Sequence, residues 1–305
     1  MIDTKAVLDI FPNNIKQIIE SLEIKELEEI RIKVDKPLLL QIGRHEIQQD
    51  YYPTKEDVKN ILYKLSNFSL YAVSEELKQG FITVKGGHRV GICGNCVMER
   101  NKVKTIKDIS SINVRVCREI IDCSNKVIPY IVENNNVYNS IIISPPKCGK
   151  TTILRDIARK LSDGMPSLEF RGKKISIIDE RSEIGGCYNG IPQLQIGIRT
   201  DIFDNCPKSE GIMMAIRSMS PDIIICDEIG SKADVESILM ALSSGVKLIT
   251  TIHGFGIEDL TNREVFKDLI GNKVFKRGIV LSNSEGTGTI EYVYDFTKGE
   301  KIWRR

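Results

Sequence analysis

The fold is decided by the segment Ile141-Ile142-Ile143-Ser144-Pro145-Pro146-Lys147-Cys148-Gly149-Lys150-Thr151-Thr152. An apolar run that leads into a tight loop and then Gly-Lys-Thr is typical of a phosphate-binding loop (P-loop) between a strand and a helix. We expect residues 144–152 to bind the phosphates of ATP. Backbone N–H groups would surround the β-phosphate, the Lys150 ammonium would reach the β and γ oxygens, and the Thr151 hydroxyl would be a ligand of Mg²⁺. The alternative is an ordinary strand, turn and helix with a solvated lysine.

One residue of this loop departs from the P-loop pattern G-x-x-x-x-G-K-[ST]. Ser144 stands where the pattern has its first glycine. Glycine suits that place because it tolerates unusual φ angles and a close approach of the backbone. Ser144 must therefore either adopt an allowed φ or carry strain.

Composition limits the class of protein. The chain has 305 residues with 41% hydrophobic residues, enough for two ordinary globular domains. Its 43 basic and 41 acidic residues give a net charge of +2, so no global field draws it to nucleic acid or anionic lipid. Eight scattered cysteines and a start without a charged and apolar leader favour a cytoplasmic protein. No stretch has the roughly 18 consecutive apolar residues of a membrane span.

The order of apolar and polar segments predicts an α/β fold with two domains. Residues 1–130 mix a helix at 15–22, strands at 29–34 and 37–42, a helix after Thr54, and a hairpin at 80–92 that turns at Gly86-Gly87, which suggests a small α+β domain. The polar run at 133–136 suggests a boundary near residue 130, with a linker slightly upstream that belongs to the first segment. Residues 131–305 alternate helices with apolar strands at 141–143, 175–178, 223–226 and 247–251. Continuous Ile and Val runs are typical of parallel strands covered on both faces. We therefore expect a RecA-like P-loop NTPase domain with a mainly parallel sheet after the smaller domain.

A second nucleotide motif follows in the apolar strand 222–226, which ends in Asp227 and Glu228. A hydrophobic strand that ends in two acids is a Walker B strand. We expect Asp227 to hold Mg²⁺ and Glu228 to polarise the water that attacks the γ-phosphate. Two adjacent acids alone are moderate evidence, but together with the P-loop they indicate a hydrolytic site.

Two further strand ends carry candidate catalytic residues. Asp179 and Glu180 follow the strand 175–178, and His253 ends the strand that begins near residue 247. Ligands bind at the carboxyl edge of open parallel sheets, so these side chains are expected near the phosphates. Glu180 is a candidate for orienting water or Mg²⁺. A hydroxyl of Thr250-Thr251 and the imidazole of His253 are expected to sense the γ-phosphate, with His253 donating a hydrogen bond as charge develops. The alternatives are a solvated charge cluster and a structural histidine.

Phosphoryl transfer also needs positive charge beyond Lys150. Arg199 and Arg217 are expected near the nucleotide edge of the sheet, where one of them would act as a finger across a subunit interface. Most arginines are surface residues, so this assignment competes with simple solvation.

Four stretches together resemble one family, the stage III sporulation AA proteins of the type II/IV secretion ATPase superfamily. They are Gly-Phe-Ile-Thr-Val-Lys-Gly-Gly-His-Arg-Val-Gly at 80–91, Cys-Gly-Lys-Thr-Thr at 148–152, Ile-Asp-Glu-Arg-Ser-Glu-Ile at 178–184, and Ile-Arg-Ser-Met-Ser-Pro-Asp at 216–222. The resemblance covers nearly the whole chain.

The resemblance implies a Mg²⁺-dependent ATPase motor in the mother-cell cytoplasm of endospore-forming bacteria. It implies a homo-oligomer, a hexameric ring, docked peripherally on membrane channel proteins of the sporulation complex, with no nucleic acid as partner. In secretion ATPases the positions of Asp179-Glu180 and His253 are the Asp box and the His box. Family rings also bring first-domain arginines to the phosphates, which makes Arg115 and Arg118 candidate nucleotide ligands.

Two other functions stay open from the sequence. One is a nucleic-acid-binding RecA-like or helicase-like ATPase, because Gly91-Ile92-Cys93-Gly94 fits a G-x-x-G backbone clamp. The balanced charge and the lack of a basic, aromatic stripe count against it. The other is a scaffold in which ATP only stabilises the folded ring.

Overall fold

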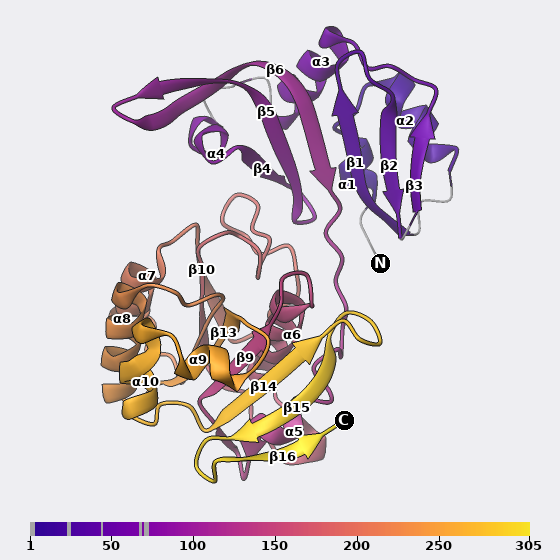
Figure 1. Ribbon diagram of the computed structural model, residues 1–305. Helices are drawn as coiled ribbons and strands as arrows, with labels where there is room; N and C mark the ends of the chain where they lie inside the picture. The colour runs from indigo at the N-terminus through magenta and orange to yellow at the C-terminus, as the bar shows by residue number, and fades with distance from the viewer. Residues whose placement is uncertain (1–3, 23–25, 44, 67–68, 70–72) are drawn as a thin grey trace. The chain divides into compact units, whose positions relative to one another are not determined.

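The computed structural model describes residues 4–22, 26–43, 45–66, 69 and 73–305 (Figure 1). These residues form two compact units. The first comprises residues up to Glu119 together with Gly186–Gln193, and the second comprises Ile120–Gly185 with Leu194–Arg305. Each unit has its own sheet and its own hydrophobic core.

The first unit is an antiparallel six-stranded sheet with four helices among its described residues. The strand order is β3-β2-β1-β6-β5-β4, and every neighbouring pair is antiparallel. The elements are α1 (Thr4–Leu8), α2 (Asn13–Glu20), β1 (Leu27–Lys33), β2 (Leu38–Ile42), β3 (His45–Gln49), α3 (Lys55–Leu65), α4 (Ser74–Gln79), β4 (Phe81–Val84), β5 (His88–Glu99) and β6 (Lys102–Arg115).

Local sequence signals explain two of these elements. The Thr54 hydroxyl accepts the Asp57 N–H, and the Asp57 carboxylate accepts the Thr54 N–H, which forms a capping box at the start of α3. Gly86 and Gly87 have φ angles of 87° and 75° between β4 and β5, the left-handed values that a tight hairpin turn requires. The predicted helix after Thr54 and the predicted hairpin are therefore confirmed.

The second unit is built on a mainly parallel eight-stranded sheet in the order β11-β10-β12-β13-β9-β14-β15-β16. Its elements are α5 (Ile128–Ile131), β7 (Val132–Glu133), β8 (Asn136–Val137), β9 (Ser140–Ser144), α6 (Lys150–Asp163), η2 (Pro166–Leu168), β10 (Ile175–Asp179), β11 (Thr200–Asp204), α7 (Lys208–Ser218), β12 (Ile223–Cys226), α8 (Lys232–Ser243), β13 (Lys247–His253), α9 (Ile257–Thr261), η3 (Glu264–Phe266), α10 (Lys267–Gly271), β14 (Arg277–Ser282), β15 (Thr289–Asp295) and β16 (Glu300–Arg304).

The four strands expected from apolar runs are the central strands β9, β10, β12 and β13 of this sheet. Neighbouring strands from β11 to β14 are parallel, whereas β15 and β16 extend the sheet in antiparallel fashion. The sequence analysis predicted neither β11 nor the strands β14 to β16. An α/β fold with a mainly parallel sheet and a smaller separate unit is the predicted architecture.

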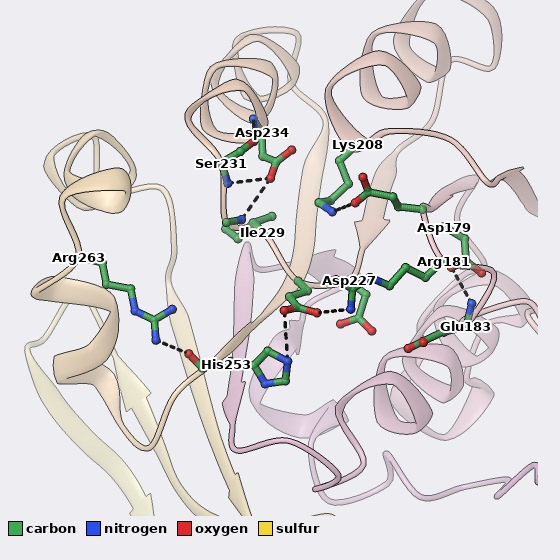
Figure 2. A pocket seen from close by; sticks show the side chains of 13 residues that line it. Asp179, Arg181, Glu183, Lys208, Asp227, Ile229, Ser231, Asp234, His253 and Arg263 are labelled. Atoms are coloured by element: carbon green, nitrogen blue, oxygen red, sulfur yellow. Dashed lines mark hydrogen bonds and ion pairs between the residues drawn. The ribbon is translucent and has the colours of Figure 1, made fainter. Parts of the chain in front are cut away.

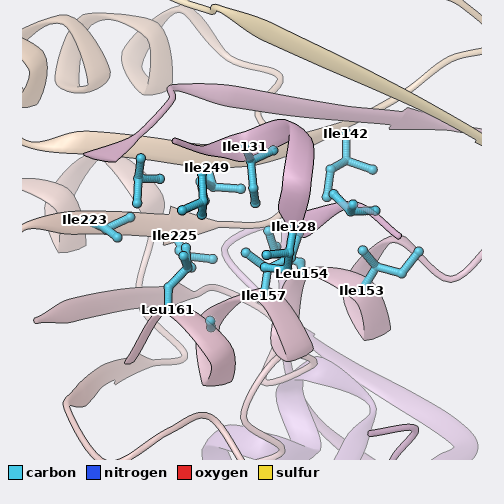
Figure 3. Close-up of a cluster of buried hydrophobic side chains, with 14 of the residues drawn as sticks. Ile128, Ile131, Ile142, Ile153, Leu154, Ile157, Leu161, Ile223, Ile225 and Ile249 are labelled. Carbon is cyan, nitrogen blue, oxygen red and sulfur yellow. The ribbon is translucent and has the colours of Figure 1, made fainter. Parts of the chain in front are cut away.

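Two cores hold the central strands, one on each face of the sheet. Ile142 and Ile249 pack with Leu154 and Ile157 of α6 on one face (Figure 3). On the other face, Ile143 packs with residues of α7 and α8. Full burial of isoleucines on both faces explains why β9 and its neighbours read as continuous apolar runs. The carboxyl ends of these strands are consequently held firmly in place.

The second unit begins at Ile120, upstream of the boundary near residue 130 that the polar run at 133–136 suggested. The reason is hydrophobic contact. Val127, Ile128 and Ile131 are buried in the core that also contains α6. The polar run itself forms the short hairpin between β7 and β8.

Candidate nucleotide site at the carboxyl edge of the parallel sheet

The loop between β9 and α6 has two residues with left-handed backbone conformation, Lys147 (φ 61°) and Gly149 (φ 82°). Ser144 is not one of them. It is the last residue of β9, its side chain is fully buried, and its hydroxyl donates to the Pro145 carbonyl at 2.9 Å. A serine fits this place without strain because the backbone there is an ordinary strand.

Gly149 closes the loop where no side chain fits. A Cβ at this position would lie 2.9 Å from Cγ2 of Thr287, in the turn between β14 and β15. Gly149 is also the N-cap of α6, and no side chain caps that helix. The first N–H groups of a fourteen-residue helix therefore point into the loop without a side-chain acceptor, which suits a phosphate.

Thr151 and Asp227 join the two nucleotide motifs. The Thr151 hydroxyl lies 2.5 Å from Oδ2 of Asp227, although the two residues are 76 positions apart. The other carboxylate oxygen of Asp227 accepts the hydroxyl of Thr251 on β13. Oδ2 of Asp227 and the Thr151 hydroxyl are hard oxygen ligands that converge on one point. They fit Mg²⁺, which is usually bound by one or two protein oxygens together with water and phosphate.

Glu228 lies between two nitrogen groups at the end of β12. Its carboxylate oxygens are 3.2 Å from Nε2 of His253 and 3.2 Å from Nη1 of Arg181 (Figure 2). Nδ1 of His253 is in turn 3.0 Å from Nζ of Lys150. An ammonium donating to Nδ1 and an Nε2–H donating to the carboxylate give one consistent hydrogen-bond chain. The predicted residues Lys150, Glu228 and His253 therefore do come together.

Burial changes the protonation behaviour of Lys150. Desolvation lowers the pKa of its ammonium, while the negative charges of Asp227 and Glu228 act in the opposite direction. The free energy of keeping this lysine charged thus depends on the two acids that follow β12.

Asp179 is almost completely buried at the end of β10. Desolvation raises the pKa of its carboxyl to about 6, even though hydrogen bonds from the N–H groups of Gly185, Glu183 and Ile184 oppose the shift. Those three bonds, of 2.8 to 2.9 Å, fold the chain after β10 back onto the strand. Asp179 therefore has a structural role: it anchors the chain that follows β10, and this positions the next residue, Glu180, at the edge of the sheet.

The acids line a pocket of about 370 Å³ (Figure 2). Six carboxylate residues and three cationic residues contribute to its wall, so its charge is strongly negative before any ligand binds. Its lining residues are Asp179, Glu180, Arg181, Glu183, Lys208, Asp227, Glu228, Ile229, Gly230, Ser231, Asp234, His253 and Arg263.

Two residues of this site, Lys208 and Arg263, were not predicted from the sequence, and a third, Thr251, was expected only as a hydroxyl at a strand end. Lys208 begins α7, is nine-tenths buried, and forms an ion pair with Glu180 (Figure 2). Arg263 donates to the carbonyl of His253 at 2.8 Å. Thr251 contacts Asp227 and Glu228 from the neighbouring strand. Lys208 and Arg263 belong to no motif, whereas the sequence did place a hydroxyl of Thr250-Thr251 at this strand end.

The expected positions of Arg199 and Arg217 were wrong. Arg199 precedes β11, and its guanidinium donates to the carbonyl of Ser162 at 2.8 Å, in the last turn of α6. That end of the helix lies about 20 Å from Lys150 at its start. Arg217 is exposed in the last turn of α7, whereas the first residue of that helix, Lys208, lines the pocket. Both arginines thus lie at the amino edge of the sheet, because each helix runs the full length of the strands.

Arg115 and Arg118 belong to the first unit. Arg115 ends β6, and Nη1 of Arg118 is 3.7 Å from Oε1 of Glu28. Their part in nucleotide binding stays a prediction. Within the described residues, no helix is long and apolar enough to cross a membrane.

Comparison with known proteins shows which family the chain matches. The model of the family "Sporulation stage III, protein AA" matches residues 3–302. Stage III sporulation protein AA of Bacillus subtilis (strain 168) is 42% identical over 292 residues, which are 95% of this chain and 94% of that protein.

Among solved structures, the Yersinia pseudotuberculosis ATPase DotB is similar with a TM-score of 0.63 and 15% identity, over 94% of this chain and 80% of that one. The pilus retraction motor PilT, solved with bound ADP, is similar with a TM-score of 0.60 and 15% identity, over 87% and 76% of the two chains. At such identities the likeness concerns the fold, and it supports the RecA-like architecture predicted from the sequence.

Proposed function

The chain belongs to the sporulation stage III protein AA family, as its motifs predicted, and from this premise we propose that it is a Mg²⁺-dependent ATPase. The observation that carries the proposal is the contact between Thr151 and Asp227, which brings the P-loop and the Walker B strand to one point. Lys150 and Glu228 lie on either side of His253 at the same edge. A phosphate-binding loop, a site for a hard cation and a carboxylate for water are thus collected together.

The geometry supports a division of roles. The N–H groups at the start of α6 and the Lys150 ammonium bind the β and γ oxygens. Thr151 and Asp227 would hold Mg²⁺, which would supply positive charge to offset the negative charge that develops on the phosphate oxygens. Glu228 orients the attacking water and accepts its proton, since Arg181 and His253 fix its carboxylate from two sides. Glu180 supports the water from the neighbouring strand end.

The negative charge of the pocket supports a ring assembly. Six carboxylates and three cationic residues line the pocket, and Lys150 adds one positive charge outside that lining, so a bound polyanion would gain from positive charge that a neighbouring chain would supply. Arg199 and Arg217 do not line the pocket of their own chain, so either would serve only across a subunit interface. Arg115 and Arg118 are the candidates from the first unit. We propose a homo-hexamer in which hydrolysis drives motion of one domain against the other.

Family membership supports a proposal for where the protein works in the cell and with which partners. The protein would work in the mother-cell cytoplasm during endospore formation, peripheral to the membrane and docked on channel proteins of the sporulation complex. ATP hydrolysis would energise that channel. No nucleic acid partner is required.

The test is steady-state ATP hydrolysis by the assembled protein, with Mg²⁺ or with EDTA. Lys150→Ala should abolish nucleotide binding, and Glu228→Gln should retain binding and lose turnover. Lys232→Ala, at an exposed residue outside the pocket, is the control. Activity that survives both site substitutions would contradict the assignment. Nucleotide-dependent stabilisation without turnover in the assembled wild type would instead indicate a scaffold.

A further inference from the structure

Thr251 contacts the Walker B turn through both its side chain and its backbone. Its hydroxyl donates to Oδ1 of Asp227 and accepts the N–H of Glu228 at 2.9 Å. Its carbonyl accepts the N–H of Ile229 at 3.1 Å. Two consecutive N–H groups of the turn after β12 therefore donate hydrogen bonds to one residue of β13.

The turn that Thr251 holds has an unfavourable backbone conformation. Glu228 has a φ of 52°, a left-handed value that costs a non-glycine residue free energy. Such a conformation persists only where the surroundings enforce it. The bonds on either side of Glu228 come from Thr251, whose side chain is fully buried. The direction of the Glu228 carboxylate thus depends on a hydroxyl of the neighbouring strand.

The same hydroxyl also fixes the acid proposed for Mg²⁺. Asp227 gives one oxygen to Thr151 and the other to Thr251. The donor on Oδ1 prevents the carboxylate from rotating, which keeps Oδ2 turned toward the P-loop. We infer that Thr251 is a positioning residue that couples the orientation of the metal-binding Asp227 to that of Glu228. The inference rests on the proposed ATPase function and adds a residue to it.

Its neighbour Thr250 offers a matched control. Thr250 is equally buried on β13, but its hydroxyl faces Cys226, whose thiol lies 3.5 Å away. Thr250→Val and Thr251→Val remove the same hydroxyl one position apart and keep the β-branched shape. A general effect of a lost hydroxyl on the strand would appear in both variants.

The first measurement is hydrogen exchange of the peptide that contains Glu228 and Ile229, followed by mass spectrometry without nucleotide. Thr251→Val should speed exchange in this peptide, because the Glu228 N–H loses its acceptor. Thr250→Val and Thr251→Ser should exchange as the wild type does. Unchanged exchange in Thr251→Val would overturn the inference whether or not the protein hydrolyses ATP.

The second measurement separates binding from turnover. For Thr251→Val we expect kcat to fall about 10- to 100-fold, the usual effect of losing a residue that orients a metal ligand. Affinity for a fluorescent ATP analogue should stay unchanged in EDTA and lose most of its enhancement by Mg²⁺. Thr251→Ser should restore both. A kcat within threefold of Thr250→Val, with the full Mg²⁺ enhancement, would overturn the inference.

Folding is checked by circular dichroism and thermal unfolding of each variant. Should Thr251→Val not fold, Thr251→Ala removes the hydroxyl without placing a methyl group against Asp227, and the same outcomes apply. A wild type that neither binds nor hydrolyses nucleotide would refute the proposed function. The exchange result would still decide whether Thr251 holds the turn.

Discussion

Nζ of Lys150 lies 3.0 Å from Nδ1 of His253, and Nε2 of the same ring lies 3.2 Å from Glu228. One imidazole therefore connects the lysine proposed to bind phosphate to the carboxylate proposed to orient water. Both groups are placed by a common neighbour.

Replacing His253 should reduce turnover more than binding. His253→Ala removes the contact that fixes Glu228 and leaves the P-loop backbone intact, so kcat should fall about tenfold with KM changed less than threefold. Steady-state kinetics on the assembled protein measures this. His45→Ala, at an exposed residue of β3, is the control. A rise in KM at unchanged kcat would show that His253 serves nucleotide binding instead.

Lys208 should act through Glu180. Its ammonium is buried against that carboxylate and holds Glu180 in place. Lys208→Met should let Glu180 turn out into solvent, away from the proposed catalytic water, and so lower kcat about tenfold. Because Glu180 is 44% exposed, the loss of stability should be small. In a Glu180→Gln background, Lys208→Met should lower kcat little further, which a double-mutant cycle measures. Lys232→Met, at the first position of α8, should leave turnover unchanged, and additive effects of Lys208→Met and Glu180→Gln would refute the coupling.

Asp179 should make stability fall as the pH rises. Its pKa of about 6 in the folded protein lies above the ordinary value of 3.8, so folding favours the protonated form. The stabilisation is complete below pH 4 and is lost as the pH rises through 6, which amounts to about 3 kcal/mol. Urea unfolding between pH 4.5 and pH 7, compared with Asp179→Asn, measures it. A wild-type advantage that grows with pH would show that the three N–H donors outweigh desolvation.

Ser144→Gly and Gly149→Ala should have opposite outcomes: the first should leave catalysis nearly unchanged, and the second should abolish nucleotide binding. Ser144→Gly should leave kcat and KM within twofold, because Ser144 already has strand geometry, and cost about 0.5–1 kcal/mol of stability through chain entropy. Gly149→Ala should abolish nucleotide binding, since φ is 82° and Cγ2 of Thr287 leaves no room. Equilibrium binding and urea unfolding test the pair. A higher kcat in Ser144→Gly would contradict this prediction, because it would show that the serine slows turnover in the wild type.

Motifs that follow one another along the chain were predictable. The strands that end in Ser144, Asp179, Cys226 and His253 read as apolar runs because both their faces are buried. A parallel sheet then brings their carboxyl ends to one edge, which is why most of the candidate site could be predicted.

Residues placed by tertiary structure were not predictable. Lys208 reaches the pocket only because α7 starts at the carboxyl edge, and for the same reason Arg217 ends at the other edge. Thr251 matters through a bond to the next strand, for which the sequence has no pattern. The strands β15 and β16 were missed because they have no continuous buried apolar run. β14 has such a run, Ile279 to Leu281, and was missed although it resembles β9 in this respect.

The position of β9 within the sheet has a consequence for synthesis of the protein. β9 pairs with β13 and β14, so Ser140 lies beside Ile249 on one side and Arg277 on the other. The loop after β9 is thus synthesised about a hundred residues before β13 and still further before β14, the two strands that its own strand pairs with. Contacts between such distant segments form slowly. Nascent chains that lack β14 should therefore be unable to bind nucleotide, and the proposed nucleotide site should form only after β13 and β14 have been synthesised.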